Sequence, residues 1–105
     1  MSGTAKGAVG VRGEASIRLD GRDVVLRPSF AALCAAEEEL GPLFALVERA
    51  AEGRLGIGDV VALFWHCADG RASRDAIGTA VVEGGLANAT PALRLLLSQI
   101  LQGRA

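Results

Sequence analysis

The sequence predicts an α+β fold in which one N-terminal β-hairpin is followed by about four or five short helices. An Asp-Gly pair lies between two runs of alternating apolar residues, and the chain after Pro28 repeats apolar residues at helical spacing. Half of the 105 residues are hydrophobic, with a mean hydropathy of +0.35. A chain of this length and composition supports one domain with a packed core.

The hairpin is predicted from its turn. Asp20-Gly21 favours a type I′ turn, in which both central residues take a positive φ, and a two-residue loop fixes the strand register. The resulting pairs are Leu19 with Arg22, Arg18 with Asp23, Ile17 with Val24, Ala15 with Leu26 and Glu14 with Arg27. Two of these pairs are opposite in charge, the apolar residues share the other face, and Pro28 ends the second strand.

Capping residues and glycine stops divide the rest of the chain into helices. We expect helices over residues 30–40, capped by Ser29, and over 42–52, with Pro42 in the first turn. A third helix opens at Gly58 or Asp59 and runs to about 69, a fourth covers 74–83, capped by Ser73, and the last runs from Pro91 onward, capped by Thr90. Their predicted apolar faces are Phe30, Leu33, Cys34 and Leu40; Leu43, Leu46, Val47 and Ala50; Val60, Leu63, Phe64 and Cys67; Ile77, Ala80 and Val81; and Leu93, Leu96, Leu97, Ile100 and Leu101.

Residues 1–12 are rich in Gly, Ser and Ala, so we expect a flexible N-terminal tail followed by a single domain over 13–105. Cys34 and Cys67 lie in apolar runs and are expected to be buried thiols in a reducing compartment. The N-terminus resembles no secretory signal, and no apolar segment has the length of a membrane span. The sequence therefore predicts a cytoplasmic protein.

A net charge of −1 argues against a nucleic-acid-binding module and against a polybasic membrane anchor. The segment 74–83 has few basic or amide side chains with which to read bases, and the glycines form no phosphate-binding motif. We therefore expect no nucleic acid, membrane or cofactor partner. A small regulatory DNA-binding domain is the first alternative function.

The single histidine, His66, is followed by Cys67 and Asp69. Neighbouring residues on a helix point about 100° apart, so His66 does not face Cys67, and the spacing matches no zinc site. We expect no catalytic and no metal-ligating residues, and a thiol enzyme is the second alternative. Glu37 falls on the apolar face of its helix, so either that face ends there or the carboxylate caps or pairs with another group.

Three large apolar residues lie beside the predicted faces: Val61, Trp65 and Leu95. They belong either to a core that is wide enough to meet two neighbouring helices or to a partner-binding patch. An isolated hairpin also has two open edges, so it must pack on the helices, pair with a second copy or receive a partner strand.

Three segments carry a resemblance to a known family: RLDGRDVVLRPSFAALCAAEEELG, LFALVERAAEGRLGIGDVVALF and AVVEGGLANATPALRLLLSQIL. From about Gly13 to Leu101 the chain resembles the tail-assembly-chaperone-like proteins of gene transfer agents and tailed phages. The similarity lies in the Asp-Gly hairpin, the Arg-Pro-Ser-Phe helix entry, the Leu-Gly stop and the Glu-Gly-Gly break before a Leu-rich helix. Trp65-His66-Cys67 matches no motif of that family.

The resemblance implies a non-enzymatic chaperone that binds the tape-measure protein and keeps it soluble until tail tube subunits polymerise around it. Such proteins are encoded beside the tail tube and tape-measure proteins and are not expected in the finished particle. The tail tube protein is a further partner, and a homo-oligomer and a longer frameshifted form stay open. A helical, Ala- and Leu-rich domain with extra apolar surface suits capture of a helix in a groove.

Overall fold

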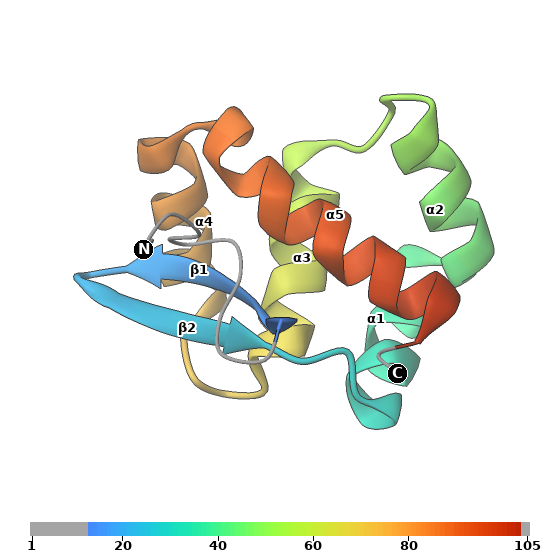
Figure 1. Ribbon diagram of the computed structural model, residues 1–105, viewed down its shortest axis with the longest axis horizontal. Coiled ribbons are helices and arrows are strands. Elements are labelled where there is room, and N and C mark those ends of the chain that lie inside the picture. The colour runs from blue at the N-terminus through green and yellow to red at the C-terminus, as the bar shows by residue number, and fades with distance from the viewer. Residues whose placement is uncertain (1–12, 104–105) are drawn as a thin grey trace.

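The computed structural model describes residues 13–103 and confirms a two-stranded hairpin followed by five helices (Figure 1). The tail expected over residues 1–12 lies outside the described residues. The elements are β1 (Ala15–Leu19), β2 (Arg22–Leu26), α1 (Phe30–Leu40), α2 (Leu43–Ala51), α3 (Ile57–Ala68), α4 (Arg74–Gly84) and α5 (Leu86–Gln102).

The hairpin has the predicted turn and register. Asp20 and Gly21 have φ angles of 51° and 80°, and the strands pair from Ala15 with Leu26 to Leu19 with Arg22. Both predicted ion pairs form outside the core: Arg18 Nη1 lies 3.1 Å from Asp23 Oδ1, and the Arg27 and Glu14 side chains are 2.9 Å apart. Local turn chemistry and charge thus agree with the strand pairing.

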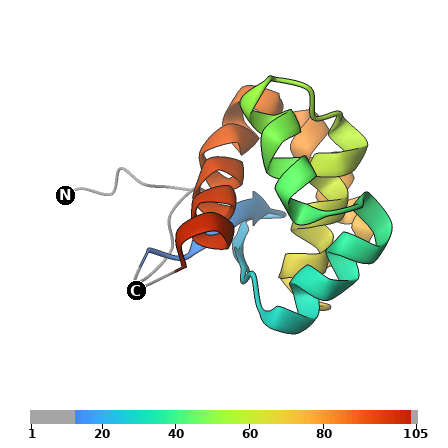
Figure 2. The ribbon, with the colours of Figure 1, turned by 90° about the vertical axis from the view of Figure 1, so that its right-hand side faces the viewer.

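The apolar face of the hairpin is buried against helices, which is the first of the three expected solutions for its stability. β1 packs against α4 and α5, and β2 packs against α3. The Arg27 backbone N–H also donates a hydrogen bond of 2.9 Å to the carbonyl oxygen of Cys67, at the end of α3. Figure 2 shows the hairpin beside α5, and Figure 1 shows it on the left of the view with α2 on the right.

Helix α3 forms the centre of the molecule and contacts α1, α4, α5 and β2. Its predicted apolar face is confirmed, because Val60, Leu63, Phe64 and Cys67 are all buried. Ala62 and Ala68 are buried as well, so α3 is enclosed on more than one side. On α4, Ile77 and Val81 face the core as predicted.

The buried face of α1 differs from the prediction. Ala32 and Ala36 are its buried residues, whereas Phe30 is 86% exposed and Cys34 is exposed. Small alanine side chains occupy the buried side of α1, so Phe30 and Cys34 are left on its outer side, while Leu33 and Leu40 are half-buried and pack against the core. The expectation that both cysteines are buried is therefore wrong for Cys34 and correct for Cys67.

The junction of α1 and α2 explains Glu37. Its carboxylate Oε2 accepts a hydrogen bond of 3.0 Å from the backbone N–H of Leu43, the first residue of α2. Pro42 was predicted in the first turn, but it immediately precedes the helix and provides no side-chain cap, so Glu37 supplies one from the preceding helix. The expectation that Glu37 caps or pairs with another group is confirmed.

Two predicted helix starts are wrong. Helix α3 begins at Ile57, just before the predicted start at Gly58 or Asp59, and the Asp59 carboxylate accepts a hydrogen bond of 3.0 Å from the Gly56 backbone N–H as part of the cap. Helix α5 begins at Leu86, so Pro91 lies inside it. Proline at this position gives up one backbone hydrogen bond, whereas the longer helix brings Ala89 into the core.

The buried face of α5 is centred on Leu96, together with Ala89 and Ala92. Leu97 is half-buried rather than central, and Leu101 is exposed. Leu95 is also half-buried and packs against the core. The predicted stripe is therefore largely correct, because Leu93, Leu97 and Ile100 pack against the core beside Leu96, and it is wrong at Leu101.

We expect Gly21→Val to destabilise the protein by about 1–3 kcal/mol, because a β-branched residue resists the positive φ of this turn. A Cβ atom at Gly21 would have no heavy atom within 4 Å, so the penalty is conformational rather than steric. Chemical denaturation measures it, with Asp20→Asn as a control that suits the same turn. Equal stability of all three proteins would contradict the role of this turn.

We expect Leu96→Ala to lower the free energy of unfolding by about 2–5 kcal/mol, because its side chain is fully buried. Leu95→Ala and Leu97→Ala should each have a smaller effect, and the two effects should be similar, because these side chains flank Leu96 and are half-buried. Thermal or urea unfolding of the three variants tests the order. A larger loss from Leu97→Ala would show that α5 is rotated.

Candidate functional site

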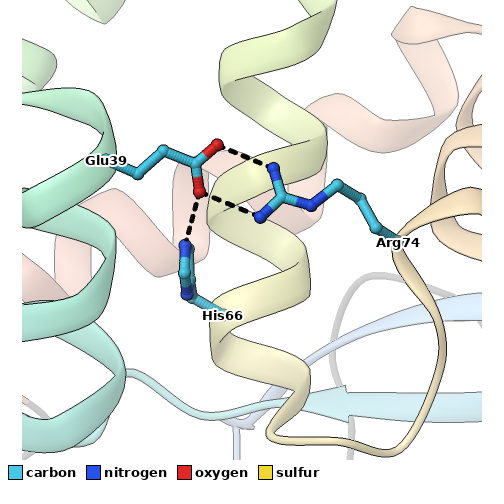
Figure 3. Close-up of polar contacts among 3 residues, drawn as sticks. All are labelled: Glu39, His66 and Arg74. Carbon is cyan, nitrogen blue, oxygen red and sulfur yellow. Dashed lines mark hydrogen bonds and ion pairs between the residues drawn. The ribbon is translucent and has the colours of Figure 1, made fainter.

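A polar cluster joins three helices around Glu39 at the end of α1 (Figure 3). Arg74, the first residue of α4, donates two hydrogen bonds to the carboxylate, of 2.7 and 2.9 Å. His66 Nε2, on α3, lies 2.8 Å from Glu39 Oε1. A carboxylate only accepts hydrogen bonds, so Nε2 carries the proton in this contact. The cluster therefore connects α1, α3 and α4 through one side chain.

The electrostatics of the cluster follow from these contacts. The hydrogen bonds from Arg74, and then the one from His66, lower the pKa of Glu39 from 4.5 to about 2. The same bonds from Arg74 to Glu39 raise the pKa of the guanidinium. Both shifts favour the charged forms, which is the behaviour of a structural ion pair rather than of a proton donor or acceptor near neutral pH.

Trp65 lies under this cluster. The guanidinium carbon of Arg74 is 4.3 Å from the centroid of the Trp65 ring, and the rings of Trp65 and His66 meet edge to face at 4.8 Å. This arrangement is a cation–π contact. It covers one face of an indole that the sequence assigned to a partner-binding patch.

The residues of that patch are not brought together. Val61 and Trp65 are one turn apart on α3, on the side that meets α4, and a Cβ atom at Gly78 of α4 would lie 3.8 Å from Val61 Cγ1. Leu95 lies on α5, on the same flank as Gln99, whose side chain reaches the Gly13 carbonyl oxygen beside β1. All three are half-buried and pack against the core. The geometry agrees with a wide core, and partner binding by these residues stays a prediction.

The two cysteines have different environments. Burial raises the pKa of Cys67 to about 12, so its thiol is protonated at neutral pH. Cys34 is exposed on α1, and His66 contacts Glu39 in place of a thiol. Neither cysteine therefore has the arrangement of base and nucleophile that thiol catalysis needs.

The DNA-binding alternative has little support on α4. Its one basic residue, Arg74, is engaged by Glu39, while Asp75 and Glu83 place negative charge on the same helix. Such a surface repels phosphates.

The large exposed apolar residues lie elsewhere, and sequence patterns did not single them out as a surface. Phe30 is 86% exposed, Phe44 is 78% exposed and Leu101 is 52% exposed. Phe44 and Leu101 line a hollow of about 220 Å³, here called the Phe44 hollow, whose other walls come from α1, α2 and α5. Its remaining lining residues are Leu33, Glu37, Leu43, Val47 and Ile100.

A signal for this surface was available in the sequence. Phe44 lies beside the predicted apolar stripe of its helix, as Trp65 lies beside that of α3, and this position indicates an aromatic side chain outside the core. Phe30 was assigned to the core because helical spacing alone does not show which side of a helix meets its neighbour.

Comparison with known families gives the biological context. Residues 12–103 match the model of a family described as "Phage tail tube protein, GTA-gp10". The chain belongs to this family. A comparison with curated proteins and one with solved structures each found no match.

Family membership confirms the expected relation to gene transfer agents and phage tails. The family's description names the tail tube and not a chaperone, so the tail-related role is the part of the expected function that is supported directly. It also indicates a structural rather than an enzymatic protein. Within residues 13–103, no helix is long and apolar enough to cross a bilayer.

We expect Glu39→Gln to lower stability near pH 7 by no more than about 1 kcal/mol, because the Glu39 side chain is 38% exposed and solvent screens the ion pair. The folded-state pKa of Glu39 is depressed, so its contribution is present above pH 4.5 and is lost as the pH falls toward 2. Urea denaturation of wild type and variant across this range measures it.

Glu38→Gln is the matched control, because it removes the neighbouring exposed carboxylate and leaves the cluster intact. A wild-type advantage over Glu39→Gln that is equal at pH 7 and pH 2 would contradict the ion-pair interpretation.

Proposed function

We propose that this protein is a tail assembly chaperone, which binds the tape-measure protein and keeps it soluble while the tail tube assembles. The observation that carries the proposal is the exposure of Phe30 and Phe44, two of the three phenylalanines of the chain, the second of which lines an apolar hollow. Membership of a phage tail family supports a partner in tail assembly.

Exposed aromatic side chains favour binding to a protein partner. Aromatic residues on a surface are enriched where proteins bind one another, because their burial in the complex contributes strongly to affinity. A hollow with helical walls fits an amphipathic helix that lays its apolar face into a groove. A long helical protein presents many such faces before it is enclosed in a tube.

A tail tube subunit is the second candidate, because the family's description names that role. The two-stranded sheet leaves each strand with one edge that has no neighbouring strand among residues 13–103. Copies of the chain could pair along such edges and so build a polymer. A tube subunit stays in the finished tail, whereas an assembly chaperone does not.

Co-expression with the neighbouring tape-measure protein tests the proposal. We expect wild type to raise the soluble yield of the tape-measure protein, as measured by fractionation and immunoblotting, and we expect purified tails to lack the chain. An equally soluble tape-measure protein without this chain would contradict a chaperone role. Stoichiometric presence in purified tails would favour the tube subunit instead.

The same assay tests the patch of Val61, Trp65 and Leu95. A folded Trp65→Asp variant that no longer raises the soluble yield would support the patch, because a carboxylate opposes burial in an apolar contact. A variant that behaves like wild type would show that the patch is misplaced while the chaperone role stands. Circular dichroism controls for folding, since Trp65 also contacts Arg74.

A further inference from the structure

We propose that the surface formed by Phe30, Phe44 and the Phe44 hollow docks an amphipathic helix whose flanks are basic. This inference names the binding surface and the chemistry of its occupant. It rests on the proposed function only for the identity of the natural partner.

The shape of the surface selects a helix. Leu33 of α1, Val47 of α2 and Ile100 of α5 line the Phe44 hollow, so three helices surround one apolar depression. Phe30 lies one turn before Leu33 on the same side of α1 and extends the apolar area beyond the hollow. Rows of side chains on helices pack well into such depressions.

The attachment of α2 favours a surface that adapts to its occupant. Leu46 is its one buried residue, and its main packing partner is α1. Gly41 precedes α2 and Gly53 follows it, with φ angles of 91° and 72° that other residues adopt at a cost. Helix α2 therefore has few buried contacts to lose when a partner helix enters beside it.

The acidic residues around the Phe44 hollow favour a helix with basic residues beside its apolar stripe. Residues 28–48 contain four glutamates and no Lys, Arg or His, and residues 95–103 contain no charged residue. Glu39 is neutralised by Arg74 outside this surface. Glu37 lines the hollow, and Glu48 lies one turn after Phe44 on the same face of α2.

The same charge disfavours a second copy of the chain as the occupant. Two copies related by a twofold axis through this surface would place their acidic rims together, and like charges across an interface oppose association. A helix with Lys or Arg beside its apolar stripe meets both the apolar hollow and the acidic rim.

The test uses the full chain and a fluorescein-labelled synthetic helix of about 18 residues, or five turns, with a leucine stripe flanked by lysines. A matched peptide carries glutamates in place of the lysines. Fluorescence anisotropy should show binding of the lysine peptide and affinity at least about tenfold weaker for the glutamate peptide at low salt. Equal affinities would overturn the charge argument.

Substitutions then locate the site. Phe44→Ser should weaken binding of the lysine peptide at least about tenfold. Val82→Ser is the matched control, because Val82 is 66% exposed on α4, outside this surface, and its substitution should leave binding unchanged. Glu48→Lys should reduce the preference for the lysine peptide. Should Phe44→Ser fail to fold, Leu101→Ser replaces it.

Cys34 allows an independent check, because it is exposed one turn after Phe30, whereas Cys67 is buried. A benzophenone maleimide on Cys34 should cross-link the lysine peptide. In the control, Cys34→Ser is combined with Thr79→Cys, which moves the reagent to α4. This double variant should not cross-link the lysine peptide. Cross-linking from position 79 alone would overturn the proposed location.

Three further outcomes separate the inference from the proposed function. Light scattering shows whether the chain forms a dimer. A dimer that Phe44→Ser abolishes, together with no binding of the peptide, would assign the surface to a second copy and overturn the inference. A tape-measure protein kept soluble equally by wild type and Phe44→Ser would overturn the surface and leave the chaperone role. Peptide binding without any effect of the chain on the solubility of the tape-measure protein would overturn the chaperone role and leave the binding surface.

Discussion

The burial of α3 is the constraint on which the rest of this structure depends. Six of its residues are buried, including the large side chains of Leu63 and Phe64. One neighbour cannot cover a helix that is apolar on several sides, so α1, α4, α5 and the hairpin all pack around it. The position of each other element follows from the part of α3 that it covers.

Covering α3 also explains why α1 exposes aromatic surface. The buried side of α1 consists of the small residues Ala32 and Ala36, with the half-buried Leu33 and Leu40 beside them, so Phe30 is left on the outer side. An exposed phenylalanine in that position contributes little to the stability of the fold. The packing of α1 against α3 and the exposure of Phe30 therefore both follow from the orientation of α1.

The sequence predicted those features that depend on neighbouring residues. The Asp20-Gly21 turn fixes the hairpin register, and Ser29 caps α1 by accepting a hydrogen bond from Ala32 at 3.1 Å. The start of α5 was not predictable in this way, because Pro91 is a good first-turn residue and only tertiary packing extends the helix to Leu86. At this helix start, tertiary packing overrides the local preference of Pro91 for the first turn.

The candidate sites were harder to predict for the same reason. Glu39 lies 27 residues from His66 and 35 from Arg74 along the chain, and no local pattern relates the three. The exposed surface around Phe44 required knowledge of which side of α1 and α2 meets the core. Helical spacing identifies the residues that share a face, but the fold decides whether that face is inside.

The packing of the hairpin has a consequence for folding during synthesis. β1 is made first, yet it packs against α4 and α5. Gln99 also donates a hydrogen bond of 3.2 Å to the Gly13 carbonyl oxygen, and these two residues are 86 positions apart in the sequence. A nascent chain that lacks α5 therefore leaves part of the apolar side of β1 uncovered. The domain must complete its core late, after a long stretch of chain has left the ribosome, and contacts between distant segments slow folding.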